Sequence, residues 1–129
     1  MSLEKKIKVS IITVCYNSSK FIRSAIESAL SQDYNDIEYI IIDGGSHDGT
    51  MDIINDFQGR IAHVVSEPDK GIYDAMNKGI SLATGGVIGI VNSDDFYSNP
   101  YVISQVVQTF KDNPNTDLVL GNVDFVNAK

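Results

Sequence analysis

The sequence predicts an α/β domain in which helices cover both faces of an open, mostly parallel sheet, giving three layers. Two observations support this fold class. Short apolar or β-branched segments alternate along the chain with segments whose apolar residues recur at helical spacing. The second of the short segments also has a nearly continuous apolar end, which is typical of strands buried on both faces. The 129 residues suffice for one domain, since about two thirds of the unfolded surface can be buried at this length.

The first strand is predicted at Val9–Val14, a β-branched run that stops at a polar cluster able to turn the chain. The following helix begins at Phe21 and ends near Gln32, because apolar residues recur there at three- and four-residue spacing. Ile37–Ile42 is the second predicted strand. It leads directly into an Asp-Gly-Gly-Ser segment, which begins a loop.

A short second helix is predicted to extend to about Phe57, with Asp48 or Thr50 able to cap its start. Ile61–Val65 is the third predicted strand. The order strand, helix, strand, helix, strand is that of parallel strands joined by right-handed crossover helices. The sequence therefore favours helices on both faces of the sheet.

The second half of the chain continues this alternation. A helix is predicted over Ile72–Ala83, and Thr84–Gly86 separates it from a fourth strand at Val87–Val91. Pro100 suits the first turn of another helix, because its missing N–H would have no partner there. Asp117–Leu120 is the fifth predicted strand.

Charge and cysteine content exclude several functions. Ten Lys and Arg residues against seventeen Asp and Glu residues give a formal net charge of −7, which opposes binding to nucleic acid. Cys15 is the one cysteine, so neither an internal disulfide nor a multi-cysteine zinc site can form. A reducing, intracellular compartment is therefore expected. The opening residues lack the apolar region of a secretory signal, and no apolar run is long enough to span a membrane.

Polar clusters follow three of the predicted strands. Because ligands bind outside the carboxyl ends of parallel strands, these clusters are expected to meet at one edge of the sheet. Each cluster taken singly is also typical of an ordinary turn. Asp94 and Asp95 repel each other unless a cation, water or a donor lies between them, so their loop predicts either a divalent metal site or a solvated turn. The clusters are Tyr16-Asn17, Asp43–Ser46 and Asn92–Asp95.

Other kinds of site are disfavoured. The chain has neither a Gly-x-x-x-x-Gly-Lys-Ser/Thr phosphate loop nor a Gly-x-Gly-x-x-Gly segment after the first strand. Its first loop carries no Lys or Arg before Lys20, which disfavours a nucleotidyltransferase. Cys15 has no accompanying base signature and is expected to be a small buried thiol. His47 and His63 share no metal-binding pattern.

Four segments, taken together and in order, resemble the glycosyltransferases of family 2. The resemblance extends from about Lys8 to Val123, and the shared order and spacing of the segments make it specific. The segments are the first strand with Cys15-Tyr16-Asn17, then Ile40–Thr50, Ser66–Gly79 and Val91–Asp95.

This resemblance implies a GT-A fold that binds a nucleoside-diphosphate sugar, expected to be a UDP-sugar, together with Mn²⁺ or Mg²⁺. The family's Asp-x-Asp metal motif corresponds to Asn92–Asp95. By this correspondence Asp95 is a metal ligand, and Asp94 binds the metal, its waters or the donor ribose. Tyr16 would lie against the base, and Asp43 would help to recognise it.

The resemblance also assigns donor binding to a further set of residues. For Asp74 and Asn77, which lie in the predicted third helix, the alternative is a solvated helix face on which Asp74 pairs with Lys78 at i,i+4. Tyr16 has an alternative role as a ring that covers the sheet edge. The further donor-binding residues are Thr13, Asn17, Lys70, Asp74 and Asn77.

Two positions depart from the family pattern. Many relatives have a second Asp where Gly44 stands in this chain. Many also begin the metal motif with Asp where Asn92 stands. The base contact and the first metal contact are therefore left open by the resemblance.

Family members continue well beyond such a metal motif, into a part that completes the acceptor site and supplies the general base. Residues 1–129 are therefore expected to be a single donor-binding domain of an inverting transferase, weakly active or inactive alone. The expected acceptor is a glycan or a lipid-linked sugar, as in the assembly of bacterial surface polysaccharides.

The expected location is cytoplasmic, with peripheral association at the inner face of the membrane. Apolar surface left uncovered by a missing part would favour a homo-oligomer. The alternative function is a non-catalytic nucleotide-binding or interaction domain with the same fold.

Overall fold

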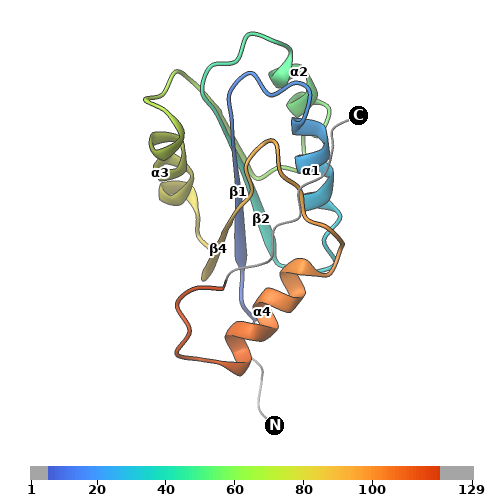
Figure 1. Cartoon of the computed structure of the whole chain (residues 1–129), viewed down its shortest axis with the longest axis vertical. Coiled ribbons are helices and arrows are strands. Elements are labelled where there is room, and N and C mark those ends of the chain that lie inside the picture. Colours follow the sequence, from blue (N-terminus) through green and yellow to red (C-terminus); the bar gives the residue numbers. More distant parts are fainter. Residues whose placement is uncertain (1–5, 120–129) are drawn as a thin grey trace.

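The computed structural model describes residues 6–119, in which four strands alternate with four helices (Figure 1). The elements are β1 Val9–Cys15, α1 Ile22–Leu30, β2 Ile37–Asp43, α2 Thr50–Asn55, β3 His63–Ser66, α3 Ile72–Leu82, β4 Val87–Ile90 and α4 Val102–Asp112. The strand order is β3-β2-β1-β4, and all three pairings are parallel. The register places Cys15 beside Asp43 and Ile12 beside Ile90. The central strand β1 therefore ends between the loops that follow β2 and β4.

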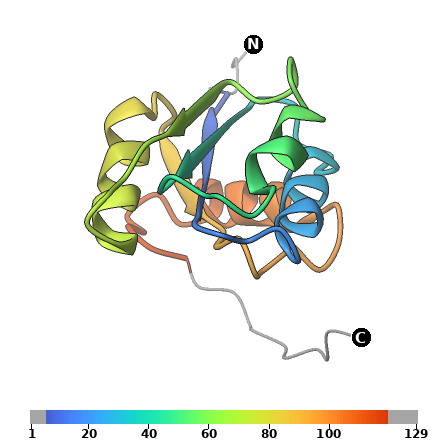
Figure 2. The ribbon, with the colours of Figure 1, turned by 90° about the horizontal axis from the view of Figure 1, so that it is seen from above.

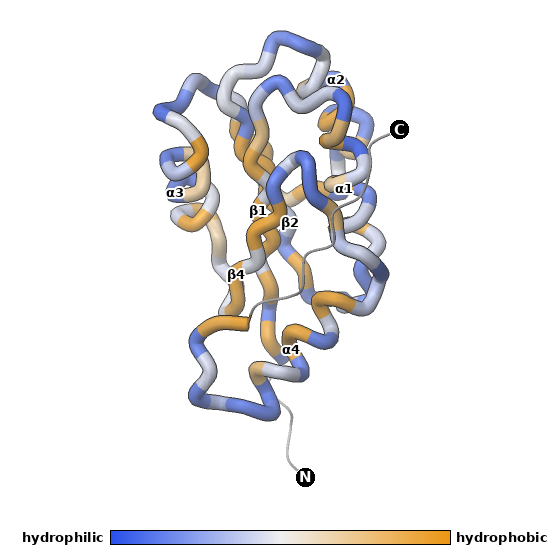
Figure 3. The backbone as a smooth tube through the Cα atoms, viewed as in Figure 1, coloured by the Kyte–Doolittle hydropathy of each residue, from blue (hydrophilic) through white to orange (hydrophobic). Residues whose placement is uncertain are grey.

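The sheet is the middle of three layers (Figure 2). Buried side chains of α1, α2 and α4 pack with Ile11 and Ile41 on one face. On the opposite face α3 packs over Ile12 and Ile40. Alternate residues of a strand point to opposite faces, so a strand covered on both sides must be apolar at nearly every position. Figure 3 accordingly shows the hydrophobic residues concentrated in the strands and the hydrophilic residues in the loops.

The predicted order of elements is confirmed, with differences at several ends. The N-cap of α2 is Gly49, which makes no side-chain cap bond, so the prediction that Asp48 or Thr50 caps this helix is wrong; Asp48 instead accepts the Thr50 N–H at 3.1 Å from the residue before the cap. Helix α2 ends at Asn55, because the chain continues in turns, one of which joins the Arg60 N–H to the Phe57 carbonyl at 3.0 Å. Strand β3 consequently begins two residues later than predicted.

Two predictions for the last part of the chain differ from the structure. Helix α4 begins at Val102, so Pro100 lies in the turn before it. The fifth predicted strand is not formed by residues 117–119, which join no strand pairing within the described residues, and Leu120 lies outside them. No helix in the described part of the chain combines the length and the apolar character that crossing a membrane requires.

Glu38 is a buried carboxylate that attaches the connection between α3 and β4 to the central strands. It accepts hydrogen bonds from Ser10 Oγ at 2.8 Å and from the N–H and Oγ1 of Thr84 at 2.9 and 3.0 Å. Lys8 Nζ lies 3.4 Å from Glu38 Oε2, and the Gly85 N–H donates to Ser10 Oγ at 2.9 Å. The hydrogen bond from the Thr84 backbone, with the other bonds, lowers the pKa of Glu38 to about 2 against the opposing effect of burial.

A Glu38→Gln variant is expected to lose about 2 kcal/mol of unfolding free energy at neutral pH, because charge-assisted bonds become neutral ones. Glu38 titrates near 4.5 when unfolded and near 2 when folded. Its stabilising contribution is therefore complete above pH 4.5 and is lost as the pH falls toward 2. Urea unfolding at about pH 7, 5 and 3 measures both effects. A difference between wild type and variant that stays constant down to the lowest pH would contradict this assignment.

Candidate functional site

The carboxyl ends of β1 and β4 form the candidate site, at the end of the sheet where the connecting loops gather (Figure 1). Strands β2 and β3 are added on one side of β1, whereas β4 is added on the other side, so the strand order reverses between β1 and β4. Open α/β sheets bind ligands at such switch points. The hydroxyls of Ser18 and Ser93, 2.7 Å apart, join the loop after β1 to the loop after β4. The prediction that these polar clusters meet at one edge is confirmed.

Asn17 joins the loop after β1 to the loop after β2. Its φ of +49° lies in the left-handed region, which Asn adopts more readily than most residues. Its N–H donates to Ser46 Oγ at 2.8 Å, and its Oδ1 accepts the N–H of His47 at 2.9 Å. The Ser18 N–H donates to Thr50 Oγ1 at 2.8 Å in the same region. The structure therefore gives Asn17 a loop-ordering role, with its side-chain oxygen bonded within the protein.

Tyr16 is the first residue after β1 and is 60% exposed. A ring that served to cover the sheet edge would be largely buried against it. The exposure of Tyr16 instead leaves aromatic surface available to a flat ligand such as a nucleobase, which stacks well on aromatic side chains.

Asp43 ends β2 and is fully buried. Its carboxylate accepts the N–H groups of Gly45 and Ser46 at 3.1 and 2.9 Å, the hydroxyls of Ser46 and Ser66, and the Cys15 thiol at 3.4 Å. Burial alone would raise the pKa of Asp43, but these hydrogen bonds hold it below its ordinary value. Asp43 thus orders the loop after β2, and a contact with a base would have to compete with donors from its own chain.

Two side chains of β1 lie in the core beside this loop. Thr13 is fully buried, and its hydroxyl shares a hydrogen bond of 2.8 Å with the Tyr39 hydroxyl. The structure therefore does not place the Thr13 side chain where a donor could reach it, which corrects the prediction for this residue. Cys15 is buried as predicted. Burial, and next the charge of Asp43, raise the pKa of its thiol, so the thiol remains protonated and unreactive.

The acidic loop after β4, Asn92–Asp95, carries two carboxylates that form no ion pair with any Lys, Arg or His of residues 6–119. Asp94 and Asp95 are both exposed, and partial burial followed by repulsion from Asp94 raises the pKa of Asp95. Asn92 Oδ1 is buried without a hydrogen-bond partner, the one such side-chain atom among residues 6–119. Carboxylate and amide oxygens are ligands that hard divalent cations prefer.

These oxygens fit Mn²⁺ or Mg²⁺ only in part. Within the described residues, no three His, Cys, Asp or Glu side chains are grouped so that they could hold a metal ion. Two carboxylates and one amide oxygen therefore leave coordination positions to water or to an anionic ligand, as is usual where Mg²⁺ binds together with phosphates.

The predicted donor residues of α3 and the loop before it divide into two groups. Asp74 accepts the N–H of Lys70 at 2.9 Å and lies 3.9 Å from Lys78 Nζ, so the alternative i,i+4 pair is present. Lys78 Nζ also lies 3.0 Å from Glu67 Oε1, and hydrogen bonding to Glu67 raises the pKa of Lys78. The side chains of Lys70 and Asn77 are exposed and bond to none of the described residues. Lys70 and Asn77 can therefore reach a ligand, whereas Asp74 stabilises the start of α3.

Three contacts at the site were not predicted from the sequence. They are the Ser18–Ser93 bond, the bond from Ser66 to Asp43, and the position of Asp69 against Gly44. The first two join residues 75 and 23 positions apart. No local pattern marks such pairs, although each member lies just after a strand that was predicted.

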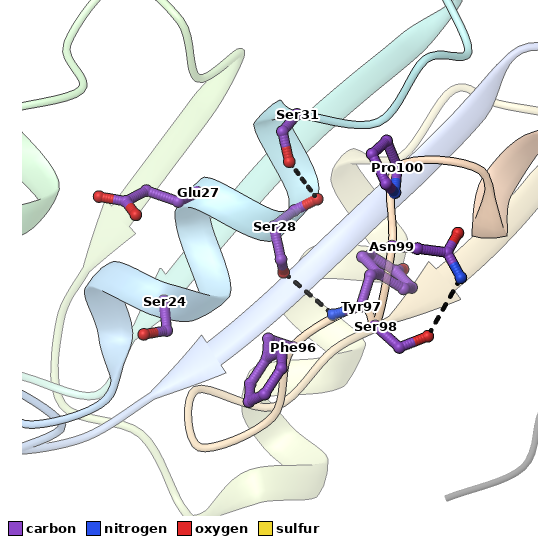
Figure 4. Close-up of a pocket in the computed structure, with 9 residues that line it drawn as sticks. All are labelled: Ser24, Glu27, Ser28, Ser31, Phe96, Tyr97, Ser98, Asn99 and Pro100. Carbon is purple, nitrogen blue, oxygen red and sulfur yellow. Dashed lines mark hydrogen bonds between the residues drawn. The ribbon is translucent and has the colours of Figure 1, made fainter. Parts of the chain in front are cut away.

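A cavity of about 470 Å³ lies between α1 and the loop 96–100 that follows the acidic loop (Figure 4). Ser28 Oγ accepts the Tyr97 N–H at 3.1 Å across its wall, and Ser24, Glu27 and Phe96 also line it. None of the predicted donor residues lines this cavity. The cavity is therefore separate from the strand-end site.

Residues 10–129 match the model of the family described as glycosyl transferase family 2. An uncharacterized glycosyltransferase of Mycobacterium tuberculosis is 39% identical over 101 residues, which are 78% of this chain and 38% of that protein. A PGL/p-HBAD biosynthesis glycosyltransferase of Mycobacterium bovis is 32% identical over 117 residues, which are 88% of this chain and 46% of that protein. The chain spans less than half the length of these relatives.

Solved structures share the same fold. TarS 1-349 of S. aureus in complex with UDP has a TM-score of 0.75 at 25% identity, over 84% of this chain and 33% of that chain. The mannosyltransferase PcManGT from Pyrobaculum calidifontis, in complex with GDP-Man and Mn²⁺, has a TM-score of 0.77 at 23% identity. That likeness covers 85% of this chain and 34% of that chain, and at this identity it shows the fold alone.

Proposed function

Because the chain belongs to glycosyltransferase family 2 and has a GT-A fold, we propose that it is the donor-binding part of a transferase that uses a nucleoside-diphosphate sugar. The observation that carries this proposal is the Ser18–Ser93 bond. It brings the exposed Tyr16 and the Asp94–Asp95 pair to one edge of the sheet. That edge therefore offers an aromatic ring for a base and oxygen ligands for a diphosphate-bound cation.

We assign the cation to Asp95, with Asp94 and Asn92 Oδ1 as its neighbours. A chain of net charge −7 and a diphosphate repel each other unless a cation lies between them. Mn²⁺ or Mg²⁺ bound there would stabilise the charge that develops on the departing nucleoside diphosphate. The exposed Lys70 and Asn77 side chains are proposed to bind the diphosphate and the donor sugar.

The base is proposed to be uracil, stacked on Tyr16, so that the donor is a UDP-sugar. The TarS structure, at 25% identity, contains UDP in a domain of the same fold, which supports this choice. The reaction proposed is an inverting displacement. The acceptor hydroxyl oxygen bonds to the anomeric carbon as the bond to the diphosphate oxygen breaks, and a general base takes the hydroxyl proton.

We place that general base outside this chain, which spans 38% and 46% of the two relatives. Residues 1–129 are accordingly proposed as one donor-binding domain. The acceptor is proposed to be a glycan or lipid-linked sugar at the inner face of the membrane, a choice to which the name of the PGL/p-HBAD relative lends support. Exposed Ile88 and Ile90 on β4 also support self-association of the isolated chain.

Calorimetric titration with UDP, UDP-sugars, GDP-mannose and uridine in the presence of Mn²⁺ tests the function. UDP and a UDP-sugar are expected to bind at least about tenfold more tightly than uridine, because uridine lacks the diphosphate that the cation holds. Equal affinities for uridine and UDP would contradict a site that binds the diphosphate. A folded chain that binds none of these ligands would favour the non-catalytic interaction domain instead.

A Tyr16→Ala variant is expected to bind UDP about tenfold more weakly at an unchanged melting temperature, since base stacking contributes about 1–3 kcal/mol and the ring is largely exposed. Tyr101→Ala is the matched control, because Tyr101 is 56% exposed at the start of α4. Titration calorimetry and thermal melting of both variants measure the effects. Unchanged UDP affinity in Tyr16→Ala would show that the ring does not stack on the base.

A further inference from the structure

Asp69 holds its carboxylate directly over Gly44, at the carboxyl end of the central strands. A Cβ on Gly44 would lie 2.9 Å from Asp69 Oδ2 and 3.3 Å from Asp69 Cγ. Gly44 does not have a positive φ, so the backbone itself would accept a side chain there. The absence of a side chain at position 44 thus makes room for the Asp69 carboxylate.

Hydrogen bonds fix this carboxylate at the end of β1. The Gly44 N–H donates to the Cys15 carbonyl at 2.9 Å, so Gly44 lies across from the residue that precedes Tyr16. The Glu67 N–H donates to the Asp43 carbonyl at 3.0 Å, which pins the start of the loop that carries Asp69. The Asp69 charge contributes to the raised pKa of Cys15, after burial and the charges of Asp43 and Asp48.

The two oxygens of Asp69 differ in their partners. Oδ1 accepts the Gly71 N–H at 2.9 Å, which sets the orientation of the side chain. Oδ2 accepts no hydrogen bond from the described residues, and Asp69 is partly exposed. Asp43, by contrast, is buried and bonded to several donors of its own chain. Of these two carboxylates, Asp69 is therefore the one that has an acceptor left for a ligand.

We propose that Asp69 determines base specificity by accepting the N3–H of uracil from a base stacked on Tyr16. This inference rests on the proposed function, which places a nucleotide at this edge. Uracil presents an N–H at ring position 3, whereas cytosine presents a lone pair there. A fixed carboxylate accepts a charge-assisted hydrogen bond from the uracil N–H, whereas the cytosine lone pair repels it. Gly44 contributes by lacking a side chain, because a Cβ there would collide with this carboxylate.

Titration of UDP and CDP in the presence of Mn²⁺ tests the proposal, because the two ligands differ only at this edge of the base. Wild type is expected to bind UDP at least about tenfold more tightly than CDP. Asp69→Asn should reduce that ratio to about threefold or less, since its oxygen stays with the Gly71 N–H and its amino group, turned to the ligand, can donate to the cytosine lone pair but cannot accept the uracil N–H. The variant keeps an oxygen for the Gly71 N–H, so it should fold as the wild type does.

Two further variants separate specificity from charge and from folding. Asp52→Asn removes one exposed carboxylate from α2 and should leave the UDP to CDP ratio unchanged. Gly44→Ala keeps every charge but forces the Asp69 carboxylate aside, and should lower the ratio as Asp69→Asn does. A wild type that binds UDP and CDP equally, or an Asp69→Asn variant that keeps the full ratio, overturns the inference while leaving intact the proposal that the chain binds a nucleoside-diphosphate sugar. A folded wild type that binds no nucleotide overturns both.

Discussion

An Asp95→Asn variant is expected to bind UDP about 100-fold more weakly than wild type in the presence of Mn²⁺, and to lose the response of UDP binding to Mn²⁺. The substitution keeps the shape of the side chain but removes the charge that a hard cation needs. Asp95 is exposed in the loop after β4, and repulsion from Asp94 contributes to its raised pKa. A bound cation would relieve that repulsion, so the carboxylate is expected to matter for ligand binding and little for folding.

The matched control for this prediction is Asp52→Asn, which removes the same charge from the first turn of α2. Titration calorimetry on both variants, with melting temperatures as a check on folding, separates a local effect from a change in net charge. Retention of wild-type UDP affinity and Mn²⁺ dependence in Asp95→Asn would show that the cation, if one binds, is held elsewhere.

A Gly85→Ala variant is expected to lose about 3 kcal/mol of unfolding free energy and about 10 °C in melting temperature. A Cβ on Gly85 would lie 2.7 Å from the Ser10 nitrogen and 2.8 Å from the Lys8 carbonyl oxygen, both backbone atoms of the β1 region. The connection between α3 and β4 would have to move away, which would break the Gly85 bond to Ser10 and strain those of Thr84 to Glu38. Because β4 carries the acidic loop, UDP affinity should fall as well.

Gly86→Ala is the control, since the nearest atom to a Cβ at that position is Ile7 Cγ2 at 4.0 Å. It should change stability by less than about 1 kcal/mol, the ordinary difference between Gly and Ala. Urea unfolding of the two variants distinguishes a steric effect at one position from a general effect of replacing glycine. Equal stability of the two variants would contradict the close packing of Gly85 against β1.

The fold was predictable because its signals are local and its core is strongly patterned. The β1 and β2 segments are almost continuously apolar, and the structure buries them on both faces between α3 and the other helices. The ends of elements were less predictable. Turns that continue past α2 delay the start of β3, and no pattern in the sequence distinguishes the last helical residue from the first turn.

The edge on which the candidate site lies was also predictable, since strand ends of a parallel sheet meet at one side. The roles of single residues were not. The resemblance assigns donor binding to Thr13 and Asp43. In the structure, however, Thr13 is buried against Tyr39, and the Asp43 carboxylate accepts hydrogen bonds from its own loop. Asp69 acquires its place through a contact with Gly44 that depends on two loops meeting in space. Such contacts follow from the fold and from no local spacing.

The dissociation constant of UDP, measured by calorimetry on the wild-type chain with Mn²⁺ and again with a chelator, tests the central claim most directly. Two exposed carboxylates in the loop that also contains an unpaired amide oxygen, in a chain of net charge −7, predict binding at least about tenfold tighter with Mn²⁺. Equal affinity under both conditions, or no binding by a folded chain, would contradict a cation-dependent donor site at the carboxyl ends of β1 and β4.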